Sequence, residues 1–139
     1  MTMRDERGVA AVELALFMSL LVGFVALTGP LVIAFKDQLE LGRAAGRTLR
    51  FATAVPDQRR FDCSGAPLGG RRPTAIQVVG EARCQIDGID AMVSPAPRGS
   101  LAGTEITVTL QKSVSLGIVG SFLGTPSLDL EATTTGVLE

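Results

Sequence analysis

The hydrophobic positions of the chain fall into one long uninterrupted run, followed by shorter segments in which apolar and polar residues alternate. Residues 14–35 are 22 consecutive uncharged positions, mostly Leu, Val, Ala, Phe and Ile. A helix needs about 20 such residues to cross the hydrocarbon core of a membrane. The run therefore predicts a transmembrane helix, because the rest of the chain is too short to surround a buried helix of that length on every side.

A cleaved secretory signal is the main alternative for an apolar segment near the amino terminus. Such signals have an apolar region of about 7–15 residues, followed by small residues at the cleavage site. The run here is longer, and it leads into Phe35, Lys36 and Asp37, which do not form such a site. We therefore expect the segment to stay in the mature protein.

Pro30 lies within the apolar run, directly after Gly29. A proline inside a helix removes the amide that would bond to the carbonyl four residues earlier, and its ring clashes with that carbonyl. A helix kink is therefore expected at Gly29 and Pro30. Such kinks are common in membrane helices and are often purely structural.

The helix is predicted to continue beyond the membrane to residue 54, since good helix formers fill this stretch and the next proline is Pro56. Arg43, Arg47 and Arg50 fall at helical spacing and form one basic stripe. A solvated face is the simplest interpretation of this stripe. The alternatives are contact with anionic lipid headgroups or with an acidic groove on a neighbouring subunit.

Three segments closer to the carboxyl end predict strands. Residues 104–110 and 127–135 alternate apolar and polar side chains, the pattern of half-buried antiparallel strands. The apolar positions of these two segments are Ile106, Val108, Leu110, Leu128, Leu130 and Ala132. Residues 89–93 are expected to supply a third strand.

Residues 55–73 are rich in Pro, Gly and charged side chains and predict a loop. Thr74 is a candidate helix N-cap, and residues 75–85 after it fit either a short amphipathic helix or a strand. The chain is therefore expected to be an α+β protein. A long N-terminal helix leads into a small domain, residues 55–139, with a short helix and an antiparallel sheet of about three strands.

The side-chain inventory argues against several kinds of chemistry. The chain has no His, so it lacks an ordinary Ser-His or Cys-His pair and any imidazole metal ligand. It has no Trp or Tyr, and its net charge of −1 gives no electrostatic reason to bind nucleic acid. In the small domain, the closest acid pair is Asp87 with Asp90, and Asp129 shares a strand face with Glu131. Both pairs lack a calcium-binding loop and fit a solvated surface. No enzyme activity, cofactor or metal site is predicted.

Cys63 and Cys84 are the two cysteines of the chain, and they lack the spacing of zinc or thioredoxin-like sites. A disulfide between them would suit a small exported domain with a thin core. Closing that loop would stabilise the fold by about 3 kcal/mol on the chain-entropy account. Two buried free thiols are the alternative, expected if the domain faced the cytoplasm.

Glu13 borders the apolar run, where a carboxylate is costly and calls for a partner. The surrounding residues, ERGVAAVE, resemble the class III signal of type IV pilin-like proteins, which has a short charged leader, Gly, and a helix with Glu as its fifth residue. A cut after Gly8 makes Val9 the first residue and Glu13 the fifth. Position alone leaves a second interpretation open, in which Glu13 is simply the first interfacial residue.

Both ends of the chain are similar to the TadE/TadF-like minor pilins of tight adherence (Tad) pili. The similar segments are RGVAAVELAL, LELGRAAGRTLRFAT and the tail EITVTLQKSVSLGIVGSFLGTPSLDLEATTTGVLE, with a strand, a Gly- and Leu-rich connection and a Thr-rich final strand. The chain departs from the family in lacking a Pro-Leu-rich run after the AVE motif, and its leader carries no net side-chain charge.

The resemblance implies a structural subunit for assembling or priming a Tad-like type IV pilus used in surface attachment. A prepilin peptidase would remove residues 1–8, and Glu13 would pair with the new amino terminus of a neighbouring subunit. The other implied partners are further pilin and minor pilin subunits, the inner-membrane assembly platform and membrane lipid. The protein would sit in the inner membrane with its domain exported, and in the pilus after assembly.

An uncleaved single-pass membrane protein, whose exported domain binds another envelope or secretion-machine component, is the alternative function. The flanking charges complicate the orientation in both cases. Lys36 and the arginines beyond it follow the span, and the positive-inside rule would place them in the cytoplasm. The cleavage motif and the cysteine pair favour the opposite orientation, with the leader inside.

Overall fold

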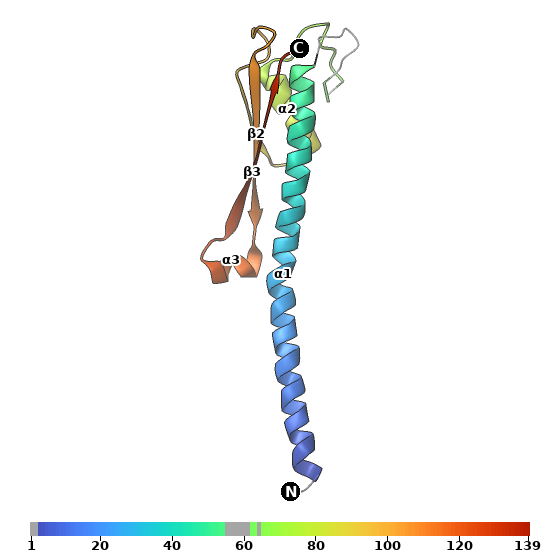
Figure 1. Ribbon diagram of the computed structural model, residues 1–139, viewed down its shortest axis with the longest axis vertical. Coiled ribbons are helices and arrows are strands. Elements are labelled where there is room, and N and C mark those ends of the chain that lie inside the picture. Colours follow the sequence, from blue (N-terminus) through green and yellow to red (C-terminus); the bar gives the residue numbers. More distant parts are fainter. Residues whose placement is uncertain (1–2, 55–61, 64) are drawn as a thin grey trace.

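The computed structural model describes residues 3–54, 62–63 and 65–139, and its architecture confirms the α+β class (Figure 1). A single long helix, α1 (Met3–Thr53), carries a small head around its carboxyl-terminal half. The head also contains α2 (Ala75–Gln85), β1 (Asp90–Ser94), β2 (Glu105–Ser115), α3 (Gly117–Leu123) and β3 (Ser127–Val137). Residues 55–61 and 64 of the loop predicted after α1 lie outside the described residues.

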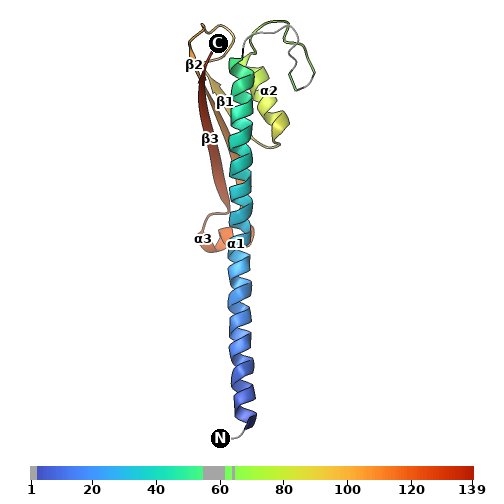
Figure 2. The same cartoon turned by 45° about the vertical axis from the view of Figure 1, so that its right-hand side comes forward.

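Helix α1 has 51 residues, which corresponds to about 76 Å at the helical rise of about 1.5 Å per residue. It ends at Thr53, one residue before the predicted boundary, and it continues through Pro30 without interruption. The kink expected at Gly29 and Pro30 therefore stays a prediction. Figures 1 and 2 show the amino-terminal half of α1 standing clear of the head, and we call its apolar part, residues 9–35, the stem.

The three strands form one antiparallel sheet in the order β1-β2-β3, with β2 in the centre. Val108 of β2 lies opposite Val93 of β1 and Thr134 of β3. Pairing between β2 and β3 continues as far as Ser115 and Ser127. The three predicted strands are thus confirmed, and the two longer ones extend beyond the segments that alternation marked.

One face of the sheet packs on the carboxyl-terminal half of α1 and forms the core (Figure 2). The predicted inward positions of β2, Ile106, Val108 and Leu110, are buried. They belong to one cluster with Leu41 and Ala45 of α1. The same helix therefore serves two purposes, because its second half supplies one wall of the core while its first half remains outside.

A capping box decides the ambiguous segment before β1 in favour of helix α2. The Oγ1 atom of Thr74 accepts a hydrogen bond from the Gln77 amide at 3.2 Å, and Oε1 of Gln77 accepts one from the Thr74 amide at 2.9 Å. These bonds satisfy two amides near the start of the helix. Val78 and Ala82 then lie buried against the core.

Helix α3 is the element that the sequence pattern does not predict. It occupies the Gly- and Leu-rich connection between β2 and β3 and ends at Gly124, which has the left-handed φ of 74°. Its seven residues make about two turns, too few to establish a helical period in the sequence. Figures 1 and 2 both place α3 beside α1, at the end of the head nearest the stem.

Candidate functional site on the stem and at its junction with the head

The stem presents a continuous exposed apolar surface. Its large hydrophobic side chains, among them Val9, Phe17, Phe24 and Ile33, are exposed. The most apolar window within Val9–Thr53 has a mean hydropathy of 2.3, and none of that window is buried inside the protein. Among the described residues, α1 is therefore the one helix long and apolar enough to cross a membrane, and its exposure differs from that of a core helix.

Glu13 is the only charged residue between Val9 and Phe35. It lies four residues beyond Val9, about 6 Å along the helix axis. Its side chain is exposed, and no described residue of the chain forms a hydrogen bond or ion pair with it. Gly8 and Val9, the predicted cleavage positions, lie in the early turns of α1. Any partner for the Glu13 carboxylate must therefore come from outside the described part of this chain.

The basic stripe of α1 lies on the surface of the head. Arg43, Arg47 and Arg50 are all exposed. Glu40 does not neutralise them, because its carboxylate lies 3.5 Å from the ammonium of Lys36. This surface agrees with a solvated face and leaves the stripe accessible to an outside partner.

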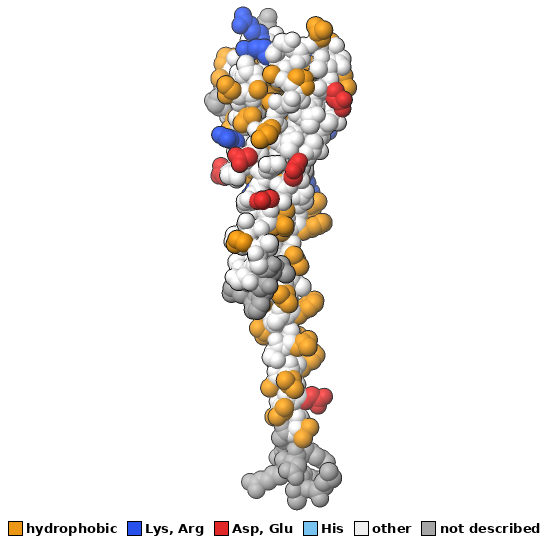
Figure 3. All heavy atoms as spheres, turned by 90° about the vertical axis from the view of Figure 1, so that its left-hand side faces the viewer, with side chains coloured by type: hydrophobic (Ala, Val, Ile, Leu, Met, Phe, Trp, Pro, Cys, Tyr) orange, Lys and Arg blue, Asp and Glu red, His pale blue; other side chains and the backbone are white. Residues whose placement is uncertain are grey.

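Polar residues join α1 to the sheet at the level where the uncharged run of the stem ends. Oδ2 of Asp37 lies 3.5 Å from Nζ of Lys112, and the two side chains are only 19% and 23% exposed. Beside this pair, Nε2 of Gln38 donates a hydrogen bond of 2.9 Å to the backbone carbonyl of Glu131. We call this group the polar belt: Asp37, Gln38, Lys112, Asp129 and Glu131. Figure 3 shows acidic side chains gathered at this junction.

Cys63 and Cys84 form a disulfide, as predicted, with their Cα atoms 6.3 Å apart. Both residues are exposed, so the alternative of two buried free thiols is wrong. Cys84 belongs to the last turn of α2, and the bridge ties this turn to the segment that precedes the helix.

The acid pairs noted in the sequence lie on exposed surface. Asp90 approaches the guanidinium of Arg83 at 4.0 Å, and Asp87 is exposed. Asp129 accepts a hydrogen bond from the hydroxyl of Ser113. No group of three or more acidic, His or Cys side chains that could hold a metal ion occurs among the described residues.

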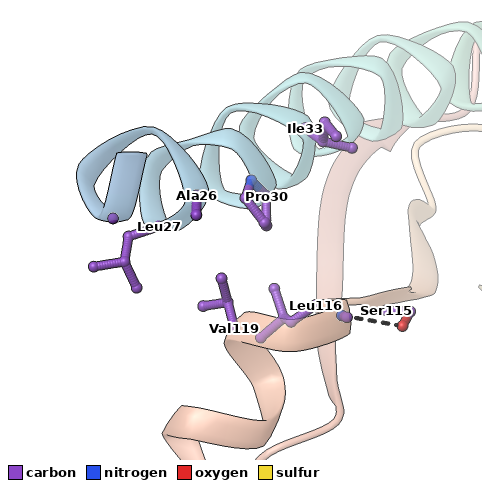
Figure 4. A pocket seen from close by; sticks show the side chains of 9 residues that line it. Ala26, Leu27, Pro30, Ile33, Ser115, Leu116 and Val119 are labelled. Atoms are coloured by element: carbon purple, nitrogen blue, oxygen red, sulfur yellow. Dashed lines mark hydrogen bonds between the residues drawn. The ribbon is translucent and has the colours of Figure 1, made fainter. Parts of the chain in front are cut away.

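An apolar cavity of about 690 Å³ lies between the stem and α3. Leu27, Pro30 and Ile33 line it from α1, and Leu116 and Val119 line it from the other side. Figure 4 shows Leu116 and Val119 extending across the gap toward α1, with the Pro30 ring on the cavity wall. The cavity combines residues that are far apart in sequence, and local sequence patterns carry no signal for it.

The described residues thus define a small α+β head built around the second half of a helix whose first half is suited to a membrane. A scan against protein-family models, a search of curated proteins and a search of solved structures each found no match to this chain.

Proposed function

We propose that this protein is a structural minor pilin, or pseudopilin, that helps to assemble or prime a Tad-like type IV pilus. The observation that carries the proposal is the exposed apolar stem, whose single charged residue, Glu13, has no partner among the described residues. A helix of this kind needs an apolar environment along its length and a cation near its beginning. A bundle of identical or related stems provides both.

The proposed assembly step begins with a cut between Gly8 and Val9 by a prepilin peptidase. The new amine of Val9 is a cation, and Glu13 of a neighbouring subunit is the anion that it meets. Opposite charges attract strongly where water is scarce, and pairing removes the penalty of leaving either charge alone in an apolar environment. Since the two groups are about 6 Å apart along one helix, pairing between subunits would also set their axial stagger.

The exposed disulfide supports an exported head. Disulfides persist in oxidising compartments and are rare in the cytoplasm, where thiols are kept reduced. The Cys63–Cys84 bridge therefore favours a head outside the inner membrane, against the expectation from the positive residues that follow the span. In this arrangement residues 1–8 face the cytoplasm, where the peptidase acts.

The experiment that tests this function is the intact mass and amino-terminal sequence of the full chain, recovered from membranes of cells with and without prepilin peptidase. We expect a start at Val9 only when the peptidase is present. A start at Met1 or Thr2 in both strains would overturn the pilin assignment. The protein would then be an uncleaved single-pass protein whose exported head binds another envelope or secretion-machine component.

A further inference from the structure

The end of the head nearest the stem carries no charge. Residues 113–128, which cover the end of β2, α3 and the start of β3, contain no Asp, Glu, Lys or Arg. The charged residues that flank this segment are Lys112 and Asp129, one register step apart across the two paired strands. We call residues 113–128 the hairpin tip.

The charge boundary of the hairpin tip coincides with that of the stem. The stem ends at Phe35, and the next residues include Asp37, which forms the ion pair with Lys112. Gln38 likewise bonds to Glu131 on the neighbouring strand. The polar belt therefore crosses α1, β2 and β3 at one level. Beyond the belt, the stem and the hairpin tip carry no charged residue other than Glu13, which lies near the far end of the stem.

The hairpin tip extends from the belt along the stem. Leu27, which lines the cavity facing α3, precedes Asp37 by ten residues, or about 15 Å along the helix axis. This distance is about half of the 30 Å hydrocarbon core of a typical bilayer. If the belt lies at the membrane surface, α3 therefore lies within one leaflet.

Some backbone amides at the turns of the hairpin tip are paired internally, which lowers the cost of an apolar environment. The Leu116 amide bonds to the Pro126 carbonyl at 3.1 Å, and the Thr125 amide bonds to the Gly120 carbonyl at 3.0 Å. At the start of α3, the Gly117 amide lies 3.4 Å from the hydroxyl oxygen of Ser115. Closing hydrogen bonds of this kind lower the cost of moving a loop out of water.

We infer that the hairpin tip inserts into the outer leaflet beside the stem, and that lipid acyl chains fill the cavity between α3 and α1. The inference rests on the membrane-spanning stem of the proposed function, but it does not depend on cleavage or on pilus assembly. Lipid is the occupant that the surface fits, because the cavity walls are apolar and continue directly from the lipid-facing surface of the stem. The head is then anchored at two depths and held upright on the membrane.

The chain offers a direct test because it contains no Trp and no Tyr, so one introduced tryptophan is the only strong fluorophore. Ser121→Trp places the probe on an exposed position of α3, where no core packing is lost. Phe24→Trp marks the stem, and Leu101→Trp marks the opposite end of the head, where the side chain is 81% exposed. Each full-length variant is placed in vesicles of phosphatidylcholine and phosphatidylglycerol, with and without lipids brominated on their acyl chains.

We expect bromolipids to quench Ser121→Trp and Phe24→Trp and to leave Leu101→Trp unchanged, with blue-shifted emission for the first two. Quenching of Phe24→Trp alone would overturn the inference and leave the membrane span intact. A Ser121→Trp emission that is blue-shifted but unquenched would assign the tip to a second copy of the chain in place of lipid. If Phe24→Trp also escapes quenching, the stem is outside the bilayer, and the membrane basis of the proposed function fails with it. Intact mass under non-reducing conditions confirms that each variant keeps its disulfide.

Discussion

Replacing Leu41 by alanine tests whether the second half of α1 is a structural wall of the head. The Leu41 side chain is 0% exposed and belongs to the core cluster with the inner face of β2. The change removes the equivalent of about three methylene groups, worth about 0.8 kcal/mol each in transfer free energy. The cavity left behind raises the expected loss to about 3 kcal/mol of the free energy of unfolding, within the usual range for such truncations.

Leu39 provides a matched control on the same helix. It lies two residues earlier and is 50% exposed, so Leu39→Ala should lower the free energy of unfolding by about 1 kcal/mol or less. The measurement is a urea titration of the full chain in detergent micelles, in which brief proteolysis reports the fraction of unfolded head. Equal losses for Leu41→Ala and Leu39→Ala would refute the packing of α1 against the sheet in this register.

Three further changes test the assembly proposal and the head. Glu13→Ala should leave membrane insertion intact but lower incorporation into pili. The control Ser19→Ala, on the same stem, should assemble normally. Pili of wild-type composition in the Glu13 variant would contradict pairing of Glu13 with a neighbouring amino terminus. Replacing Cys63 and Cys84 together by serine should lower the free energy of unfolding by about 3 kcal/mol, and reduction of the wild-type protein should reproduce this loss. Thr48→Val should raise the free energy of unfolding by about 1 kcal/mol, because the buried Thr48 hydroxyl has no hydrogen-bond partner among the described residues. The gain should be absent in Thr48→Ser, which keeps the hydroxyl, and the same urea titration measures both.

The features that the sequence predicts correctly depend on local patterns. The stem follows from an uninterrupted apolar run, and the inner face of β2 follows from strict alternation at positions such as Ile106 and Leu110. The pairing of the disulfide could be predicted because the chain has only two cysteines. Helix α2 was ambiguous until the capping bonds of Thr74 and Gln77 were seen, since the same apolar positions fit a short strand.

The features that the sequence does not predict depend on the register between distant segments. Nothing near Asp37 indicates that Lys112 is its partner, because that contact requires α1, β2 and β3 to be packed at their observed offsets. Helix α3 is too short to show a period, and the cavity that it forms with Pro30 exists only after the strands have paired. The partner of Glu13 is a different case, because the described residues do not supply one at all.

The charge-free parts of α1, β2 and β3 end at the same level, the polar belt. This alignment is difficult to explain for a head that stands free in water. A solvated hairpin gains from charged residues at its end, which raise solubility and discourage association. Here the segment between Lys112 and Asp129 has none, and the exposed stem that runs beside it has none beyond Glu13. A lipid leaflet would exclude charge from both surfaces for the same reason, the cost of burying an ion in hydrocarbon. The polar belt would then lie where water returns, which accounts for its position on all three segments at once.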